Sequence, residues 1–513
     1  MIHWYPNGER SQIPSIQITQ YVLRPILWLF RSWMRQCHVP GPAFASISNI
    51  PRLRWARSKK AHITHISLHR KYGDLVRIGP NTISIGDPLA ISKIYGTGAN
   101  FGKSDYYKVL QPMSKGKIMP GLFNTQDEQL HRAMKKPIAG IYSMTNLVEF
   151  EPYVDTTIEF FLRRLEEVQK VSGQACDLGT WLQWFAFDVM GEITFSKRLG
   201  FLDEATDVEG IMGSIWKMFG YASWVGQMPW LDKIWTKNPY ISRLLPAKNS
   251  PVVSFALARA HERTNGHLEK SSSSEYNSRD FMSRFIQARV KDPSIPEWFV
   301  TAWATSNVLA GSDTTAIMLR AIIYFLLKHP ESLRKLEQEL ELARQENRLS
   351  DIVTWKESRN LPYLDACVKE AGRLHPAIGL TLERVVPKGG VELCGKNFNE
   401  GTVVGMNPWV IHRNKAVFGP DADEWNPDRW LGDKEHRTLM ERSLLTFGAG
   451  HRTCIGKNIS YLEIYKLIPT MFGRYKMVLP DSRKEWEVTN SWLVVQTGLE
   501  VYLYRKEGSV IDA

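Results

Sequence analysis

The sequence predicts a mainly α-helical protein with a smaller β part, built as one large domain around a long central helix. Most of the 513 residues follow helical periodicity. Apolar residues run from Glu297 to His329, about 35 residues or roughly 50 Å of helix. Only two short segments, residues 72–88 and 389–408, alternate as strands do. Because a helix of this length must cross the whole core, one domain is favoured over several.

The N-terminal segment is the first element in order. Residues 21–30 read YVLRPILWLF, which is too short and too interrupted for a membrane span of about 20 apolar residues. Flanking arginines and tryptophans fit a helix in a membrane interface. A helix packed on its own protein fits equally well. We assign residues 1–43 to a membrane-associating segment ending in a Pro-rich hinge, and residues 44–513 to the main domain; no secretion signal is evident.

The two strand segments come next. Residues 72–88, YGDLVRIGPNTISIGDP, predict a β-hairpin around Gly-Pro-Asn, and residues 389–408 predict a second short strand group. Residues 265–280 are polar and contain four consecutive serines, which predicts a surface loop.

The central helix has a predicted start and stop. Ser294 and Glu297 fit a capping box with Pro296 in the first turn, and Pro330 ends the helix. The helix is apolar nearly all round, as expected for an element buried on every side.

The middle of this helix, AGSDTT at residues 310–315, breaks the apolar pattern. Gly311 costs about 1 kcal/mol of helix propensity, and Asp313 costs more unless it is paired. Thr314 can hydrogen-bond to the carbonyl of Ala310 and bend the helix. These residues either face a polar crevice for structural reasons or form a notch where a ligand meets the helix.

Composition limits the partners. The net charge is +12, but the basic residues form no stripe and no nucleic-acid-binding motif is present, so nucleic acid ranks last behind a membrane surface or an acidic protein. The five cysteines lack any paired spacing, which argues against a disulfide framework and a zinc site and fits a reducing compartment.

One of these cysteines, Cys454, lies in FGAGHRTCIG at residues 447–456. A helical pattern follows it, so the helix N-terminus should stabilise a thiolate. The surrounding glycines leave the backbone open to a flat group, and Arg452 could meet a negative substituent of that group. A haem held by the thiolate fits this pattern. A nucleophile with His451 as its base, or an inert buried cysteine, remain alternatives.

The whole segment matches Phe-x-x-Gly-x-Arg-x-Cys-x-Gly, and with it the chain resembles the cytochrome P450 family. AGSDTT resembles that family's oxygen-activation motif, and the order of motifs agrees from about residue 40 to 505. The resemblance implies haem b with Cys454 as its axial thiolate, and catalytic roles for Asp313 and Thr314. The other haem-binding residues it implies are Phe447, Arg452, Gly456, His131, Lys135 and Arg384.

The resemblance also implies a structural triad. Glu370 and Arg373 match the family's Glu-x-x-Arg helix, and Arg429 in WNPDRWL matches the arginine that joins them. One helical turn separates the first two, so they can pair. Gly372 between them, and His131 with Lys135 in place of the more usual Trp and Arg, depart from the family pattern.

Function and partners follow from the same resemblance. It implies a monooxygenase that uses O2 and electrons from an NADPH–cytochrome P450 reductase, at the endoplasmic reticulum membrane with the domain facing the cytosol. Residues 455–513 are too few for a reductase domain, and Lys457 and Arg442 are candidates for docking one. A haem-thiolate rearrangement enzyme and a non-catalytic haem ligand-binding protein are the alternatives; the Asp313–Thr314 pair favours the monooxygenase.

The substrate is expected to be a lipophilic small molecule. The sequence is most similar to filamentous-fungal members of the pisatin demethylase type, which suggests secondary metabolism and a terpenoid or polyketide. The segments expected to line the substrate chamber are mainly apolar: residues 103–122, 306–310, 377–382 and 491–495.

Overall fold

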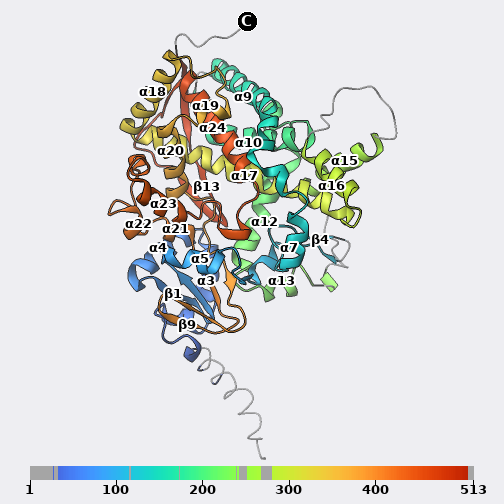
Figure 1. Ribbon diagram of the computed structural model, residues 1–513, viewed down its shortest axis with the longest axis vertical. Helices are drawn as coiled ribbons and strands as arrows, with labels where there is room; N and C mark the ends of the chain where they lie inside the picture. Colours follow the sequence, from blue (N-terminus) through green and yellow to red (C-terminus); the bar gives the residue numbers. More distant parts are fainter. Residues whose placement is uncertain are drawn as a thin grey trace, which may run out of the picture.

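The computed structural model confirms a helix-dominated fold with a smaller β part (Figure 1). It describes residues 33–506, together with residues 27 and 30, apart from residues 115–116, 173, 239, 242–250 and 267–279. The long helix α17 crosses the middle of the body, while β1 and β9 lie at its lower end. The predicted polar loop at 265–280 and the apolar stretch at 21–30 lie almost wholly outside the described residues.

The helices extend over the following ranges. They are α3 (Ile50–Arg57), α4 (Ala61–Tyr72), α5 (Ile91–Tyr95), α6 (Tyr106–Val109), α7 (Glu128–Lys135), α8 (Met144–Leu147), α9 (Glu151–Ser172), α10 (Leu178–Phe195), α11 (Phe201–Glu204), α12 (Ile211–Val225), α13 (Trp230–Ile234), α15 (Pro251–Gly266), α16 (Phe281–Lys291), α17 (Glu297–Lys328), α18 (Pro330–Gln345), α19 (Trp355–Ser358), α20 (Pro362–Leu374), α21 (Pro408–Ile411), α22 (Lys415–Phe418), α23 (Lys434–Ser443) and α24 (Lys457–Arg474). Short 3-10 turns include η7 (Pro427–Leu431) and η8 (Gly450–Arg452).

The strands are short. They are β1 (Leu75–Gly79), β2 (Thr82–Ile85), β3 (Gly102–Lys103), β4 (Met113–Ser114), β5 (Lys117–Ile118), β6 (Cys176–Asp177), β7 (Arg384–Val385), β8 (Val391–Leu393), β9 (Lys396–Phe398), β10 (Val403–Gly405), β11 (Tyr475–Val478), β12 (Glu487–Ser491), β13 (Leu493–Thr497) and β14 (Glu500–Arg505).

Parts of both predicted strand groups meet in one sheet, while β8 and β9 of the second group pair with each other in a separate two-stranded sheet. The hairpin β1–β2 is antiparallel, and the sheet continues in the order β1-β2-β10-β7-β3. Strand β10 pairs in parallel with β2, with Val404 opposite Ile83. The periodicity of each segment predicted its strands, but this pairing across more than 300 residues is set by the tertiary fold, as the separation of β2 from β10 shows.

The central helix α17 runs without interruption from Glu297 to Lys328 and is buried against α10, α20 and α24. It is the one described helix that is long and apolar enough to cross a membrane, with a mean hydropathy of 1.3, and 72% of that stretch is buried inside the protein. Burial to this extent identifies it as a core helix.

The predicted capping box at the start of α17 is wrong. Pro296 is the N-cap residue and no side chain caps the helix. The Ser294 hydroxyl instead donates to Asp292 Oδ1 at 2.6 Å, in a turn that precedes the helix. The sequence has the spacing of a capping box, but the Ser294 side chain hydrogen-bonds within the preceding turn and is not available to cap the helix.

The Pro-Gly-Pro segment packs on the folded body. The Arg77 amide donates to the Pro40 carbonyl at 2.8 Å, and a Cβ on Gly41 would lie 2.3 Å from the Arg77 carbonyl oxygen. This segment is therefore fastened along β1. The assignment of residues 1–43 to membrane association stays a prediction.

Candidate active site

The loop that carries Cys454 is a tight turn before α24. The Cys454 amide donates to the Phe447 carbonyl at 2.9 Å, which closes the loop. Gly448 and Gly450 have φ angles of 69° and 64°, where a side chain is strained. A Cβ on Gly450 would also lie 1.6 Å from the carbonyl oxygen of Tyr95. These glycines thus let the loop fold back against the end of α5.

The Cys454 thiol is accessible and yet surrounded by protein. Its side chain is exposed, while burial raises the pKa of the thiol. The residue is therefore reachable from solvent although protein surrounds its sulfur. The backbone amides of Gly456 and Lys457 lower the pKa, as expected at a helix N-terminus, but burial outweighs them, so the predicted thiolate is not favoured by the helix alone. Coordination of a metal cation would remove that proton.

The backbone next to this sulfur is open. A Cβ built on Gly456 would meet only the Cys454 sulfur, at 4.0 Å, with no other atom within 4 Å. A flat group can therefore approach the sulfur along Gly456, as the sequence predicted.

The central helix α17 has accessible residues in its middle. Ala310 is exposed and Thr314 half-buried, although they sit in the middle of a largely buried helix. Thr315 Oγ1 donates to Ser460 Oγ at 3.1 Å, which fastens α17 to the first turn of α24. Tyr142, whose pKa is raised by burial and also by Cys454, donates to Asn307 of α17 at 2.6 Å. These two hydrogen bonds thus hold the middle of α17 close to the start of α24 and to Tyr142.

Thr314 and Gly311 of the predicted notch face different surroundings. Thr314 Oγ1 donates to the Ala310 carbonyl at 2.7 Å, which is the predicted back-bond. Gly311 is turned elsewhere: a Cβ there would lie 2.7 Å from the sulfur of Met190 on α10. The glycine accommodates a neighbouring helix, so the accessible side chains of the notch are those of Ala310 and Thr314.

Asp313 lies on the face of α17 that packs against α10. Its side chain is buried, and Oδ1 accepts a hydrogen bond from Gln183 Nε2. Burial raises the pKa of Asp313 to about 6, and nearby Arg320 opposes that shift. The acid and the alcohol are neighbours in sequence but face different surroundings.

A cluster of basic groups stands beside the cysteine loop. Glu128 on α7 accepts from Arg452 Nη2 at 2.7 Å and lies 3.1 Å from His451 Nε2. Lys135 Nζ donates to the His451 carbonyl at 2.7 Å. His131 is buried on the same helix, and burial lowers its pKa to about 3. The structure therefore brings together the predicted His131, Lys135 and Arg452, around a carboxylate that the sequence did not single out.

Two further cations complete the cluster. Lys103 is buried and donates to the Phe123 carbonyl. Burial lowers its pKa well below the usual range, and the charges of Arg384 and Arg452 act in the same direction. Arg384 donates to the carbonyl of its own neighbour Glu383 at 2.8 Å. The Glu383 carboxylate forms an ion pair with Arg52 and accepts a hydrogen bond from the Ser104 hydroxyl.

Lysine and arginine side chains here therefore exceed the carboxylates that neutralise them. Glu128 pairs with Arg452 and its charge acts on Lys103, while Lys135 and Arg384 have no ion pair with a carboxylate among the described residues. Buried cations need anionic partners, so this charge excess fits a ligand with carboxylate groups. Sequence reasoning missed Lys103; its signal was a single lysine inside the aromatic stretch FGKSDYY at residues 101–107.

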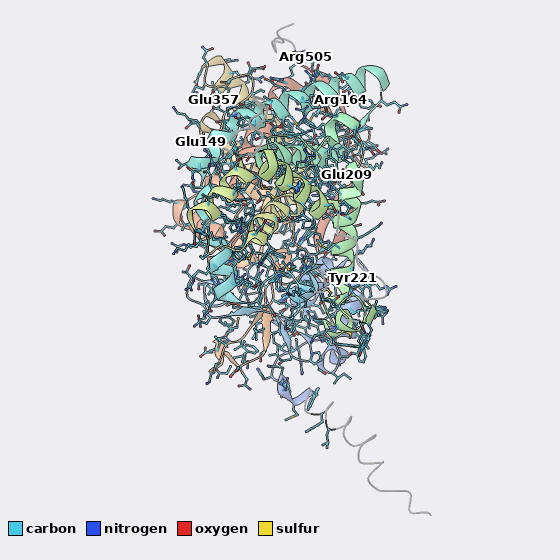
Figure 2. All side chains as sticks on the ribbon, turned by 90° about the vertical axis from the view of Figure 1, so that its right-hand side faces the viewer. Glu149, Arg164, Glu209, Tyr221, Glu357 and Arg505 are labelled. Carbon is cyan, nitrogen blue, oxygen red and sulfur yellow. The ribbon has the colours of Figure 1, made fainter. Side chains whose placement is uncertain are left out.

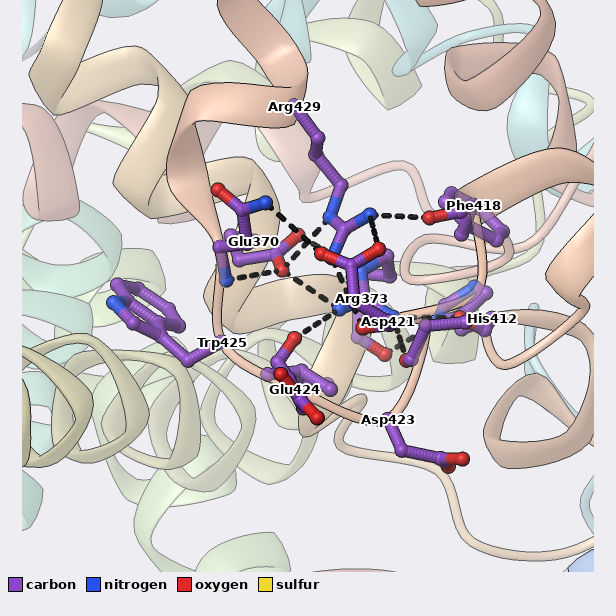
Figure 3. A network of polar contacts seen from close by, with 12 residues as sticks. Glu370, Arg373, His412, Phe418, Asp421, Asp423, Glu424, Trp425 and Arg429 are labelled. Atoms are coloured by element: carbon purple, nitrogen blue, oxygen red, sulfur yellow. Dashed lines mark hydrogen bonds and ion pairs between the residues drawn. The ribbon is translucent and has the colours of Figure 1, made fainter.

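The Glu370 triad is confirmed as a buried structural network (Figure 3). Arg373 donates to both Glu370 oxygens, at 2.8 and 2.7 Å. Arg429 and the Asn426 amide donate to Oε1 at 3.1 and 2.9 Å, and the Trp430 indole donates to Oε2 at 2.9 Å. The carboxylate is fully enclosed, and every bond stabilises its charge.

This network is joined directly to the start of the cysteine loop. His412 connects the Arg373 carbonyl at 3.0 Å to the Leu445 amide at 2.7 Å. Thr446 donates to the Gly372 carbonyl at 3.0 Å. A Cβ on Gly372 would be 3.0 Å from Thr446 and from Met318 of α17. The departure at Gly372 therefore has a packing reason, which is close contact of α20 with the loop and with α17.

Three of the four expected chamber segments meet in one apolar cluster. It contains Tyr106, Tyr107, Ala377, Leu380 and Trp492, and it reaches Ile317 on α17. The Tyr106 ring stacks on Trp492 at 5.0 Å between ring centres. The structure adds α12, through Phe219 and Ala222, which the sequence did not suggest.

Comparison with known proteins agrees with this geometry. The family model described as Cytochrome P450 matches residues 39–503. The chain belongs to the cytochrome P450 family. A cytochrome P450 monooxygenase of Aspergillus terreus (strain NIH 2624 / FGSC A1156) is 51% identical over 466 residues, 90% of this chain and 94% of that protein. In Emericella nidulans, cytochrome P450 monooxygenase cicH is 50% identical over 484 residues, and pkfB is 40% identical over 510 residues. These cover 94% and 99% of this chain, and 96% and 99% of the relatives.

Family membership gives the coarse function. The chain is a haem monooxygenase of a fungal type, as the sequence predicted, and the family implies a cysteine-ligated haem. The accessible thiol, the open backbone beside it and the excess of cations all fit such a group. Relatives named as monooxygenases favour this function over the rearrangement and non-catalytic alternatives.

Proposed function

We propose that this cytochrome P450 inserts one oxygen atom of O2 into a lipophilic small molecule of fungal secondary metabolism, a terpenoid or a polyketide. Electrons come from an NADPH–cytochrome P450 reductase. The observation that carries the proposal is the accessible Cys454 at the start of α24, the helix whose first turn is hydrogen-bonded to α17 beside the half-buried Thr314.

The chain's own residues suit the cofactor. Cys454 would ligate iron through sulfur, and Gly456 with Phe447 would leave room beside it. Arg452, His131, Lys135, Arg384 and Lys103 would neutralise the haem carboxylates. Thiolate-ligated haem supplies the activation of O2.

Thr314 and Asp313 would manage protons. The reaction consumes substrate, O2, two electrons and two protons and yields the hydroxylated product and water, so protons must reach the buried centre. Because the Thr314 hydroxyl donates to Ala310, its oxygen is left as an acceptor that can hold a water molecule. Asp313, with a pKa raised to about 6 by burial, can carry a proton near neutral pH.

The chamber favours an apolar substrate. Tyr106, Tyr107, Trp492 and Leu380 belong to one packed cluster with aromatic contacts. Such a wall favours a molecule that buries apolar surface.

The electron donor would meet a basic surface. Arg442 is exposed and Lys457 is half-buried beside Cys454 in sequence. The net charge of +12 favours an acidic docking face on the reductase.

An apolar surface supports membrane association, with the domain facing the cytosol at the endoplasmic reticulum. Trp230, Ile234, Trp235 and Tyr240, on and after α13, are each more than half exposed. These residues follow α12, which runs along the outside of the molecule. Figure 2 shows this, because Glu209, just before α12, and Tyr221, near its end, lie on the same outer side. Exposed tryptophans of this kind favour a membrane interface.

The test measures product, peroxide and NADPH together, with a substrate found by its shift of the haem spin state in a screen of terpenoids and polyketides. Thr314→Ala should keep haem content and substrate affinity, while product per NADPH falls and peroxide rises. Thr314→Ser, which keeps the hydroxyl, is the matched control. Full product yield per NADPH in Thr314→Ala would refute the proton role.

A further inference from the structure

A glutamine lies between two opposite charges on the buried face of the central helix. Asp313 and Arg320 are 2% and 3% exposed and lie on the same side of α17. No direct ion pair joins them within the described part of the chain. Gln183 of α10 bridges them: its Nε2 donates to Asp313 Oδ1, and its Oε1 accepts from Arg320 Nη2 at 2.7 Å.

The orientation of this amide is fixed by chemistry. Arginine has donors only, so the amide oxygen must face Arg320 and the NH2 group must face Asp313. Arg320 is itself held, because its Nε donates to the Gly179 carbonyl at 2.7 Å in the first turn of α10. The chain Gly179–Arg320–Gln183–Asp313 therefore has one consistent direction of hydrogen bonding.

This arrangement treats the two carboxylate oxygens of Asp313 differently. Oδ1 is tethered to Gln183, whereas the buried Oδ2 meets no donor at hydrogen-bond geometry among the described residues, although the Trp216 indole lies near enough to lower the pKa of this carboxyl. Buried polar atoms are nearly always satisfied, so Oδ2 is the oxygen of this carboxyl that remains open to a proton. Burial raises the pKa of Asp313 to about 6; Arg320 and the Trp216 indole of α12 lower it, and Asp207 raises it.

We propose that Gln183 and Arg320 are positioning residues that tether Asp313 by Oδ1 and leave Oδ2 as the oxygen that takes up a proton and passes it towards Thr314. The inference deepens the proton role proposed for Asp313 and rests on it. The amide suits this task because it conveys the effect of the Arg320 charge without titrating or moving a proton itself. A direct Arg320–Asp313 pair would instead occupy the carboxylate and hold it ionised.

The experiment uses the haem-loaded full chain and needs no substrate. Infrared difference spectra between acid and neutral pH report the carbonyl stretch of protonated Asp313, assigned by its loss in Asp313→Asn. In Gln183→Met the hydrogen bond to the carboxylate is lost, so the midpoint of this band should rise by about one pH unit, a tenfold change in proton affinity. Gln183→Glu should raise it further, because a second carboxylate is then placed beside Asp313.

Gln496→Met is the matched control. Gln496 is also buried, and its amide donates to the Ile317 carbonyl of α17 at 3.0 Å. It forms no hydrogen bond with Asp313 among the described residues. The control should leave the midpoint unchanged. An unchanged or lowered midpoint in Gln183→Met, in a protein with normal haem content, would overturn the proposal.

A second measurement separates this inference from the proposed function. With NADPH, O2 and the reductase but no substrate, the ratio of peroxide released to NADPH consumed reports proton delivery. Gln183→Met should change this ratio in the same direction as Asp313→Asn. If Asp313→Asn leaves the peroxide-to-NADPH ratio unchanged, the proton role of Asp313 is refuted. If Asp313→Asn changes the ratio but Gln183→Met does not, the positioning role of Gln183 is refuted.

Discussion

Removing the carboxylate of Glu370 should destabilise the protein by an amount that the structure allows us to estimate. In Glu370→Gln the amide offers one acceptor oxygen and an NH2 group, where five donor groups now converge. Arg429 keeps Asp421 at 2.9 Å, but fully buried Arg373 is left with carbonyl partners only. Breaking a buried pair from one side costs about 3–5 kcal/mol.

That cost converts into a change in melting temperature. At about 2.1 cal/mol/K per residue, a chain of 513 residues unfolds with an entropy of roughly 1.1 kcal/mol/K. Glu370→Gln should therefore lower Tm by about 3–5 °C if the protein unfolds as one unit. Because the network holds Leu445 and Thr446 at the start of the cysteine loop, haem content should fall as well.

The assay is calorimetry at one scan rate together with the haem-to-protein ratio. Glu441→Gln is the control. Glu441 pairs at 2.6 Å with Lys369, which is on α20 like Glu370, but the Glu441 side chain is half exposed. Exposed pairs contribute about 0–1 kcal/mol, so this variant should melt within about 1 °C of the parent. A Glu370→Gln protein that melts with the control and keeps its haem would refute the reasoning.

The remaining predictions concern the cofactor, the central helix and the membrane. Cys454→Ser should abolish the red-shifted carbonyl absorption of thiolate-ligated ferrous haem, whereas Cys367→Ala should keep it; a retained band in Cys454→Ser would mean another ligand. Gly311→Ala places a Cβ 2.7 Å from the Met190 sulfur, so it should cost about 1–3 kcal/mol of stability, measured by urea unfolding, and Met190→Ala should relieve part of that cost. Lys103→Met should lower haem affinity, measured by haem transfer to apomyoglobin, and equal transfer rates would contradict a role for its charge. Removal of residues 1–38 should shift the protein towards the soluble fraction with haem retained, and unchanged pelleting would place the anchor elsewhere.

The sequence predicted those parts of the fold that depend on local pattern. The hairpin at 72–88, the central helix and the cysteine loop follow from periodicity, prolines and glycines at fixed spacing. The parallel pairing of β2 with β10 could not be predicted, because it joins segments that are remote in sequence. Ser294 shows the limit of local motifs, since its hydroxyl hydrogen-bonds to the neighbouring Asp292 and does not cap the helix.

The candidate site was predictable in its residue types but not in its pairings. Helical phase puts Asp313 and Thr314 on different faces, yet nothing in the sequence says that Gln183 meets the first of them. Arg452 was expected to face an anionic group, and the structure shows Glu128 already beside it. Such partners are set by tertiary contacts of α10 with α17 and of α7 with the cysteine loop, which no single segment encodes.

The position of Lys103 has a consequence for how this enzyme can evolve. Its ammonium lies 4.1 Å from the ring centre of Tyr107 and 4.2 Å from that of Phe123, and Tyr107 in turn contacts Trp492. Under the proposed function, one short segment therefore serves both the charge balance of the cofactor site and the wall of the substrate chamber. A substitution selected there for a new substrate would also change how firmly the cofactor is retained. New specificities should therefore arise more readily in residues 377–382, which carry no ionisable side chain.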